Sequence, residues 1–278
     1  MPKTPAIKEW VKKSSKRLSD AGIQSARLDA EIILAHTLNK NRSYLHAHPE
    51  QTFEVKLLEI ADTRLEMRLE RVPIAYIIGY KEFYGRNFFI NDAVLIPRPE
   101  SENIIEILRE IIGQTPPLIF KDSPLRLADV GTGSGCLGIT AKLEFPELDV
   151  ILSDISPQAL KVAEKNARKL AADVTLVQSD LLTQYALTPD IIISNLPYVD
   201  KKWTRSPETD KEPGLALFAD SCGRALIEKL IIQAKNSINS GGYLIIEADP
   251  CQHKPLIEHA AKHGFKPFKK LGYILAFR

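Results

Sequence analysis

The sequence predicts an α/β protein: a doubly wound sheet preceded by a small N-terminal helical domain and a linking β-hairpin. Two observations lead to this prediction. Apolar residues recur at helical spacing up to about residue 72, and strand-like runs alternate with helix-like stretches from about residue 124 onward. The chain has 278 residues, of which 44% are hydrophobic and 26% charged, so it can form a sizeable core.

The first domain is expected over residues 1–72, with Pro73 ending its last helix. Its helices are predicted at 6–18, 28–38 and 53–71. A β-hairpin linker is expected over residues 73–97, built from short β-like runs at 75–78, 82–84 and 87–90. Prolines then make residues 95–100 an extended connector, and a helix begins near Ser101.

Residues 98–278 are expected to form the doubly wound sheet. Its strands are predicted at 125–130, 149–153, 174–178, 190–194, 242–247 and 272–277, with a further one near 265–269. Its helices are predicted at 135–144, 157–171, 221–239 and 253–263. Such sheets bind ligands at the carboxyl ends of their strands, where Asp154, Asp180 and Asn195 are placed by this reading.

The apolar run before Asn195 ends abruptly in Asn195-Leu196-Pro197-Tyr198. This tetrapeptide can hold a planar –NH2 group: the Asn195 side-chain oxygen and a nearby backbone carbonyl accept its protons, while Tyr198 packs on its flat face. The nitrogen lone pair then points out of the plane, ready to attack an electrophile. A purely structural alternative is a strand that stops before a proline, with Asn and Tyr serving the turn.

A glycine-rich loop follows the predicted strand that ends near Asp129. Glycine occupies alternate positions in Gly131-Thr132-Gly133-Ser134-Gly135, which allows the backbone to approach a ligand closely. The spacing is not that of a diphosphate-binding loop, and Asp154 lies where an acidic side chain typically accepts hydrogen bonds from ribose hydroxyls. The pattern therefore indicates a nucleoside ligand without a diphosphate, and S-adenosylmethionine fits it.

Composition and spacing bear on several other functions. The net charge of +2 is nearly balanced and by itself argues neither for nor against an anionic partner. No stable nucleic-acid partner is expected. Three scattered cysteines and six histidines without ligand spacing predict a reduced chain with no metal site. No apolar run approaches the length of a membrane span, and neither a signal peptide nor a membrane partner is expected. We expect a cytoplasmic monomer.

Five stretches of the chain together resemble the release-factor glutamine methyltransferases of the PrmC/HemK type, over almost the whole length. They are Arg27–His36, Pro73–Gly85, Leu95–Glu102, the loop Asp129–Gly135 and the tetrapeptide Asn195–Tyr198, with an echo in Glu212-Pro213 and Ala216-Leu217. The resemblance implies a Rossmann-like class I methyltransferase sheet. It also implies methyl transfer from S-adenosylmethionine to the side-chain amide nitrogen (N5) of the glutamine in the Gly-Gly-Gln motif of class I peptide chain release factors.

The same resemblance implies roles for individual residues. The cofactor would contact Asp129, Gly131, Thr132, Gly133, Ser134, Gly135, Asp154, Asp180, Leu181 and Asn195, with Asp154 on the ribose and Asp180-Leu181 beside the adenine. Asn195 and the Leu196 carbonyl would accept the glutamine –NH2 protons, while Pro197 and Tyr198 shape the slot. Two features depart from the family pattern: Leu196 stands where the family has proline, and the C-terminus lacks its usual Asp-Leu-Ala-Gly-like run.

Two other functions remain open from the sequence. Asn-Leu-Pro-Tyr is also the form found in RNA adenine dimethyltransferases, so an N6-adenine methyltransferase acting on RNA or DNA is one alternative. That reading predicts a basic groove and aromatic platforms for a flipped base. The other alternative is a non-catalytic relative that binds the cofactor without turnover.

Overall fold

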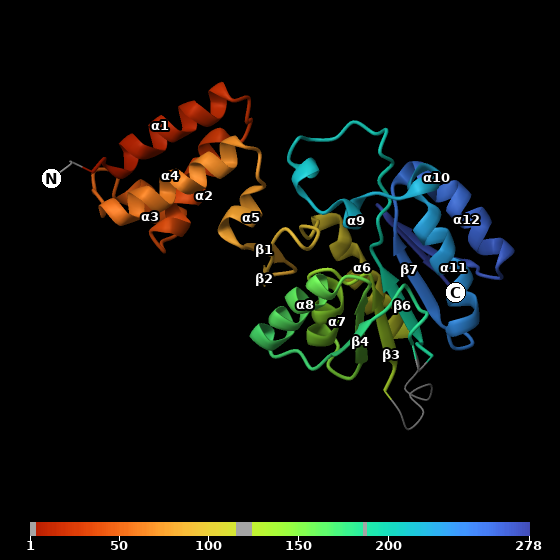
Figure 1. The fold of residues 1–278 in the computed structure, drawn as a ribbon. Coiled ribbons are helices and arrows are strands. Elements are labelled where there is room, and N and C mark those ends of the chain that lie inside the picture. The colour runs from red at the N-terminus through yellow and green to blue at the C-terminus, as the bar shows by residue number, and fades with distance from the viewer. Residues whose placement is uncertain (1–3, 115–123, 186–187) are drawn as a thin grey trace. The chain divides into compact units, whose positions relative to one another are not determined.

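A computed structural model describes residues 4–114, 124–185 and 188–278. The chain divides into two compact units, drawn in Figure 1. The helical unit consists of Met1–Gly79 and Ser206–Lys211, and the sheet unit of Tyr80–Arg205 and Glu212–Arg278. The short segment 206–211 therefore belongs to the helical unit, although its neighbours in sequence on both sides belong to the sheet unit.

The helical unit contains α1 Ile7–Asp20, α2 Ala26–Thr37, α3 Arg42–Ala47, α4 Val55–Leu69 and α5 Ile74–Ile78. The three predicted helices correspond to α1, α2 and α4. Their apolar faces form one core that includes Trp10, Leu18, Ile33, Leu34 and Leu65. The short α3 was not predicted, because six residues do not establish a helical period. Its start is fixed by the Asn41 side chain, which accepts a hydrogen bond from the Tyr44 N–H at 2.9 Å.

The predicted strand at 75–78 is wrong, because these residues form the helix α5. Ala75 and Ile77 are buried, and a short apolar run suits a buried helical turn as well as a strand. Gly79 ends the helix with φ +76°, the left-handed conformation that glycine adopts without strain.

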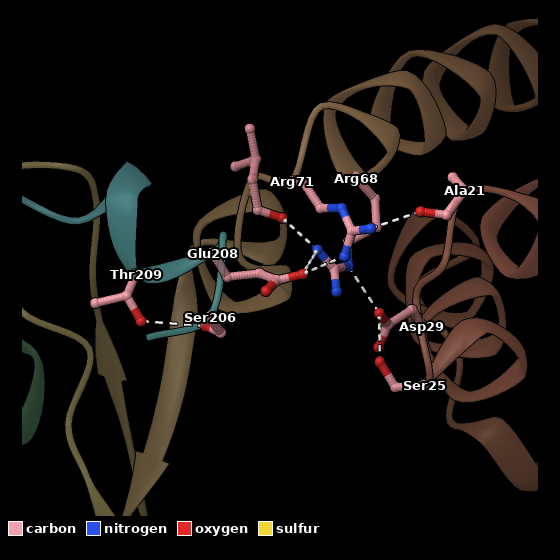
Figure 2. A network of polar contacts seen from close by, with 9 residues as sticks. Ala21, Ser25, Asp29, Arg68, Arg71, Ser206, Glu208 and Thr209 are labelled. Carbon is pink, nitrogen blue, oxygen red and sulfur yellow. Dashed lines mark hydrogen bonds and ion pairs between the residues drawn. The ribbon is translucent and has the colours of Figure 1, made fainter. Parts of the chain in front are cut away.

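A partly buried cluster of charges joins three segments of the helical unit, shown in Figure 2. Arg68 of α4 is 5% exposed, and its Nε donates a hydrogen bond to Oδ2 of Asp29 in α2 at 2.7 Å. Arg68 and Arg71 both donate to Oε1 of Glu208, at 3.1 and 3.2 Å. Glu208 precedes the short helix η3 Thr209–Lys211, so this cluster ties segment 206–211 to α4.

The sheet unit begins with the predicted hairpin, which the structure confirms. β1 Tyr80–Phe83 and β2 Arg86–Phe89 pair in antiparallel fashion. Tyr84 and Gly85, which join them, have φ values of +50° and +74°. Two successive positive φ values are what the favoured two-residue hairpin turn requires.

The α/β prediction is also confirmed, by a seven-stranded sheet in the order β5-β4-β3-β6-β7-β9-β8. The strands are β3 Arg126–Val130, β4 Asp149–Asp154, β5 Thr175–Gln178, β6 Ile191–Ser194, β7 Tyr243–Glu247, β8 Pro267–Leu271 and β9 Ile274–Phe277. β5, β4, β3, β6 and β7 run parallel, whereas β9 is antiparallel to both β7 and β8. All seven predicted strands are present. The divergent C-terminus supplies the last of them in sequence, β9.

Helices cover both faces of this sheet, as Figure 1 shows. α6 Glu102–Gln114, α7 Cys136–Glu144 and α8 Pro157–Leu170 contribute to one core cluster, and α11 Ala225–Ser237 and α12 His253–Lys262 to the other. Successive strand residues alternate between the clusters: Ile191 and Ile193 belong to the first, and Ile192 to the second. The strands are therefore apolar on both sides, which explains their unbroken hydrophobic runs.

The predicted helix 221–239 is interrupted in the structure. Two short helices, α9 Gly214–Leu217 and α10 Asp220–Gly223, come before α11. Ser221 and Cys222 both have φ +56°, and Gly223 has φ +81°. Left-handed residues cannot continue a right-handed helix, so the chain turns here before α11 begins.

Within residues 4–114, 124–185 and 188–278, no helix combines the length and apolar character needed to cross a membrane. Over the same residues, no group of three or more His, Cys, Asp or Glu side chains could hold a metal ion.

Candidate active site

Three parallel strands end at one edge of the sheet, and the predicted site residues follow them directly. β3 ends at Val130, which pairs with Ser153 of β4 on one side and with Ser194 of β6 on the other. The glycine loop, Asp154 and Asn195 therefore leave the sheet side by side. This is the edge at which doubly wound folds bind their ligands.

A cavity of about 360 Å³ lies at this edge, within the size range of small-molecule sites. Its wall includes eight predicted site residues: Gly131, Gly133, Asp154, Asp180, Leu181, Asn195, Leu196 and Pro197. Five others do not line it: Asp129, Thr132, Ser134, Gly135 and Tyr198. Apolar side chains that were not predicted complete much of the wall, among them Val94, Leu95, Ile155, Leu215 and Leu226.

The glycine loop takes a shape that other residues would strain. Gly131, Gly133 and Gly135 have φ values of +75°, +55° and +81°. A Cβ atom at position 131 would lie 2.8 Å from Cδ2 of Leu196, so glycine is what allows the Leu196 side chain to cover this end of the loop. A Cβ atom at position 133 would meet nothing within 4 Å, because the backbone there borders the open cavity.

Asp129 stabilises the glycine loop through buried hydrogen bonds. Its Oδ2 accepts hydrogen bonds from the Thr132 hydroxyl at 2.6 Å and from the Gly138 N–H at 2.9 Å. The carboxyl group is fully buried, and burial raises the pKa of Asp129 to about 6, a rise that the two hydrogen bonds limit. Its role in the structure is to fix the loop rather than to line the cavity.

Asp154 does line the cavity, and it also braces the loop. Its Oδ2 accepts the Gly133 N–H and its Oδ1 accepts the Ser156 N–H, each at 2.9 Å. Burial raises the pKa of Asp154, and the backbone hydrogen bonds oppose that rise. A carboxylate has about four acceptor positions, so both oxygens can still accept hydrogen bonds from a ligand with neighbouring hydroxyls.

Asp180 and Leu181 form another part of the wall. The Asp180 carboxylate accepts a hydrogen bond from Lys229 Nζ at 2.7 Å, while Leu181 is buried with φ +54°. The Ser179 hydroxyl donates to the Leu181 carbonyl at 2.7 Å and stabilises this left-handed turn. The result is an apolar side chain held against the cavity, a surface suited to a flat ring.

Asn195 carries an unmatched acceptor at the cavity. Its Nδ2 donates a hydrogen bond to Ser101 Oγ at 3.1 Å. Its Oδ1 is buried and has no hydrogen-bond partner among the described residues. An unpaired buried acceptor costs about 1–3 kcal/mol, and at the wall of a cavity a bound ligand can supply the missing donor.

Comparison with known proteins identifies the family. Residues 9–79 match the family described as PrmC N-terminal domain, and residues 119–210 match the methyltransferase small domain. A release factor glutamine methyltransferase from Koribacter versatilis (strain Ellin345) is 37% identical over 256 residues, which cover 88% of this chain and 88% of that protein. The chain belongs to the release factor glutamine methyltransferase family.

A second member of the family is similar to this chain over a longer stretch of sequence. The release factor glutamine methyltransferase from Leptospira interrogans is 34% identical over 270 residues, covering 94% of this chain and 92% of that protein. Among solved structures, a methyltransferase from Pyrococcus furiosus covers 78% of this chain and 98% of its own, with a TM-score of 0.52 and 19% identity. That similarity shows a common Rossmann-like methyltransferase fold.

The family implies S-adenosylmethionine as the cofactor, and the cavity has features that fit it. Asp154 has free acceptor positions for a ribose, and the Leu181 and Ile155 side chains offer an apolar surface for a base. The open space over Gly133 leaves room for a chain passing along the loop. S-adenosylmethionine supplies an electrophilic methyl group.

Ser101 and Glu247, which lie beside Asn195, are not among the residues that the sequence predicts for the site. Glu247 ends β7, is 1% exposed, and accepts hydrogen bonds from the Ser101 hydroxyl at 2.5 Å and the Tyr198 hydroxyl at 3.0 Å. Burial raises the pKa of Glu247, and hydrogen bonds from the Ser101, Tyr198 and Asn195 side chains oppose that rise. The signal was present, since an acidic residue at the carboxyl end of a predicted strand is what singled out Asp154.

The structure also joins two stretches that carried the family resemblance. Glu212, buried and just beyond segment 206–211, accepts hydrogen bonds from Arg98 Nη2 at 2.5 Å and from the Ile96 N–H at 3.1 Å. The Pro-Arg-Pro-Glu connector and the Glu-Pro pair are therefore partners in one contact. The Leu95 side chain of this connector and Pro213 both reach the cavity wall.

Proposed function

We propose that this protein transfers a methyl group from S-adenosylmethionine to the side-chain amide nitrogen of the glutamine in the Gly-Gly-Gln motif of class I peptide chain release factors. The names of its relatives support the substrate, at 37% and 34% identity over most of the chain. The observation that carries the chemistry is the buried, unpartnered Oδ1 of Asn195 at the cavity wall.

An amide –NH2 group of the substrate matches that acceptor. Asn195 Oδ1 accepts one of its protons and the main-chain carbonyl of Leu196 accepts the other, so the nitrogen is held with its lone pair out of the amide plane. The nitrogen loses one proton after it has gained the methyl group and become acidic. An amide nitrogen is a poor nucleophile, so positioning and electrostatics provide most of the catalytic effect.

The remaining site residues have supporting roles in this proposal. Gly131 and Gly133 border the methionine end of the cofactor, Asp154 holds its ribose, and Asp180-Leu181 borders its adenine, while Gly135 lies away from the cavity and leads the loop into α7. Asp129, Thr132 and Ser134 maintain the loop, and Pro197 and Tyr198 shape the slot for glutamine. Residues 1–72 are proposed to recognise the release factor, residues 73–97 to link, and residues 98–278 to bind the cofactor and carry out the transfer.

The test is mass spectrometry of a purified release factor incubated with this protein and S-adenosylmethionine. We expect one added methyl group on the Gly-Gly-Gln peptide. Asn195→Ala should reduce the rate by at least about 100-fold while leaving cofactor affinity largely intact, because it removes the acceptor and not the cofactor loop. Asn239→Ala is a matched control, since the Asn239 amide bonds to Thr188 and Asp190 and does not line the cavity.

Other outcomes separate the alternatives. Methyl label in RNA, with none on the release factor, would replace this proposal by adenine methylation. Cofactor binding without transfer to either substrate would identify a non-catalytic relative. Near-normal turnover by Asn195→Ala would disprove the role of the amide.

A further inference from the structure

The amide of Asn195 must face the substrate with its oxygen and not with its nitrogen. The two ends have nearly the same shape, but one accepts hydrogen bonds and the other donates them. If the amide were turned over, its own –NH2 would face the –NH2 group of the substrate and repel it. Some contact must therefore decide which end points to the cavity.

Ser101 makes that contact. The Nδ2 of Asn195 lies 3.1 Å from Ser101 Oγ, and Ser101 Oγ lies 2.5 Å from Oε2 of Glu247. A serine hydroxyl has a single proton, and here Ser101 uses it to donate a hydrogen bond to Glu247. Ser101 Oγ can then only accept from the amide, which requires the nitrogen end of Asn195 to face it.

Glu247 sets the direction of this chain of hydrogen bonds. Both hydroxyl groups that reach Glu247 donate to it, and hydrogen bonds of this kind favour the ionised carboxylate, which accepts and does not donate. Ser101 donates to Oε2, and Tyr198 donates to Oε1 at 3.0 Å. With Glu247 accepting at the end of the chain, only one orientation of the Asn195 amide satisfies every member, and it leaves Oδ1 without a protein partner.

We propose that Ser101 and Glu247 are positioning residues, which hold the Asn195 amide with its oxygen toward the substrate. The proposal rests on the proposed function, because it explains how the acceptor in that reaction is oriented. Ser101 and Glu247 are 2% and 1% exposed, and neither lines the cavity, so they act through Asn195. They come from η1 Pro99–Ser101 and from the end of β7, two elements far apart in sequence.

Methyl-transfer rates under single-turnover conditions test the proposal. Ser101→Ala should lower the rate by about 100-fold, the effect of a misplaced reacting group, while the affinity for S-adenosylmethionine stays unchanged. Ser101→Thr keeps the hydroxyl and should restore most of the rate. Glu247→Gln should lower the rate at least as much as Ser101→Ala, because its amide nitrogen can donate and so reverse the chain.

A double variant separates positioning from a general loss of structure. Once Asn195→Ala has removed the amide, adding Ser101→Ala should change the rate by less than about twofold. A further 100-fold loss in the double variant would show that Ser101 acts independently of Asn195, and the proposal would be overturned.

Nuclear magnetic resonance of the full chain, labelled with ¹⁵N on asparagine side chains, gives a readout that needs no substrate. The Asn195 signals are identified by their absence in Asn195→Ala. We expect slow solvent exchange of these amide protons in the wild type and faster exchange in Ser101→Ala. Unchanged exchange would refute the positioning role. If the wild type methylates no release factor, the proposed function fails, while this measurement still decides the orientation of the amide.

Discussion

Gly223 lies directly against the backbone of the Asn195–Tyr198 tetrapeptide. It has φ +81°, and a Cβ atom at this position would lie 1.9 Å from the Tyr198 carbonyl oxygen and 2.5 Å from Gln252 Nε2. Gln252 Nε2 also donates hydrogen bonds to the carbonyl oxygens of Tyr198 and Cys222, both at 2.8 Å. Gly223→Ala should therefore displace the tetrapeptide.

The structure sets the size of this effect. A carbon atom normally stays about 3.3 Å or more from a carbonyl oxygen, so the two segments must separate by more than about 1 Å. A displacement of about 1 Å near reacting groups can reduce a rate by about 100-fold. The left-handed backbone adds about 1–2 kcal/mol of strain once the residue has a Cβ atom.

Gly241→Ala is the matched control. Gly241 has nearly the same φ, +79°, but a Cβ atom there would meet only Arg278 Nη2 at 3.7 Å, an ordinary contact. This variant should show the backbone strain alone, about 1–2 kcal/mol in the free energy of unfolding, with no change in turnover.

Two assays decide the outcome: urea denaturation for stability and single-turnover methyl transfer for rate. We expect Gly223→Ala to lose more stability than Gly241→Ala and to lose about 100-fold in rate. Equal stability losses, with a normal rate in both variants, would show that the turn at Gly223 does not support the tetrapeptide, and the reasoning would be refuted.

Three further predictions concern the cofactor, the helical unit and pH. Asp154→Ala should weaken S-adenosylmethionine binding by about 10- to 100-fold in calorimetry, the value of hydrogen bonds to a charged group; unchanged affinity would exclude its ribose role. Arg68→Ala strands the buried Asp29 carboxylate and should cost about 3–5 kcal/mol in urea unfolding, whereas Arg17→Ala, at an exposed ion pair, should cost about 0–1 kcal/mol; equal losses would contradict this account. Burial raises the pKa of Asp129 from 3.8 to about 6, so its contribution to stability is full below pH 3.8 and lost as pH rises through 6. Asp129→Asn should flatten the stability curve over that range, and an unchanged curve would assign the pH dependence elsewhere.

The sheet could be predicted closely from the sequence because burial on both faces leaves a plain signal. Its central strands show unbroken apolar runs, such as Ile191–Ile193, between polar turns. The position of Asp154 and Asn195 at one edge then followed from the parallel arrangement alone. Eight predicted site residues line one cavity for this reason.

The parts that could not be predicted depend on tertiary contacts. The run at 75–78 has no period long enough to separate a strand from a helical turn. The turn at 221–223 places two non-glycine residues, Ser221 and Cys222, at positive φ, which such residues rarely adopt. Gln252, from a later segment, stabilises this turn by donating a hydrogen bond to the Cys222 carbonyl. A serine such as Ser101 has no distinctive pattern, and only the fold shows that it meets both Asn195 and Glu247.

Leu196 shows how the site accommodates a departure from the family pattern. A proline at this position would restrict φ before any contact forms, a restraint usually worth about 0.4–1 kcal/mol. Leucine lacks that restraint, but its side chain is buried, belongs to the same core cluster as Val130, and covers Gly131. Burying a leucine contributes about 1.5–3 kcal/mol, which is enough to hold the same peptide in place through packing. The carbonyl that would accept the second proton of the substrate belongs to the Leu196 main chain, so replacing proline by leucine preserves it. The Leu196 side chain also packs against Gly131 and so links the tetrapeptide to the glycine loop.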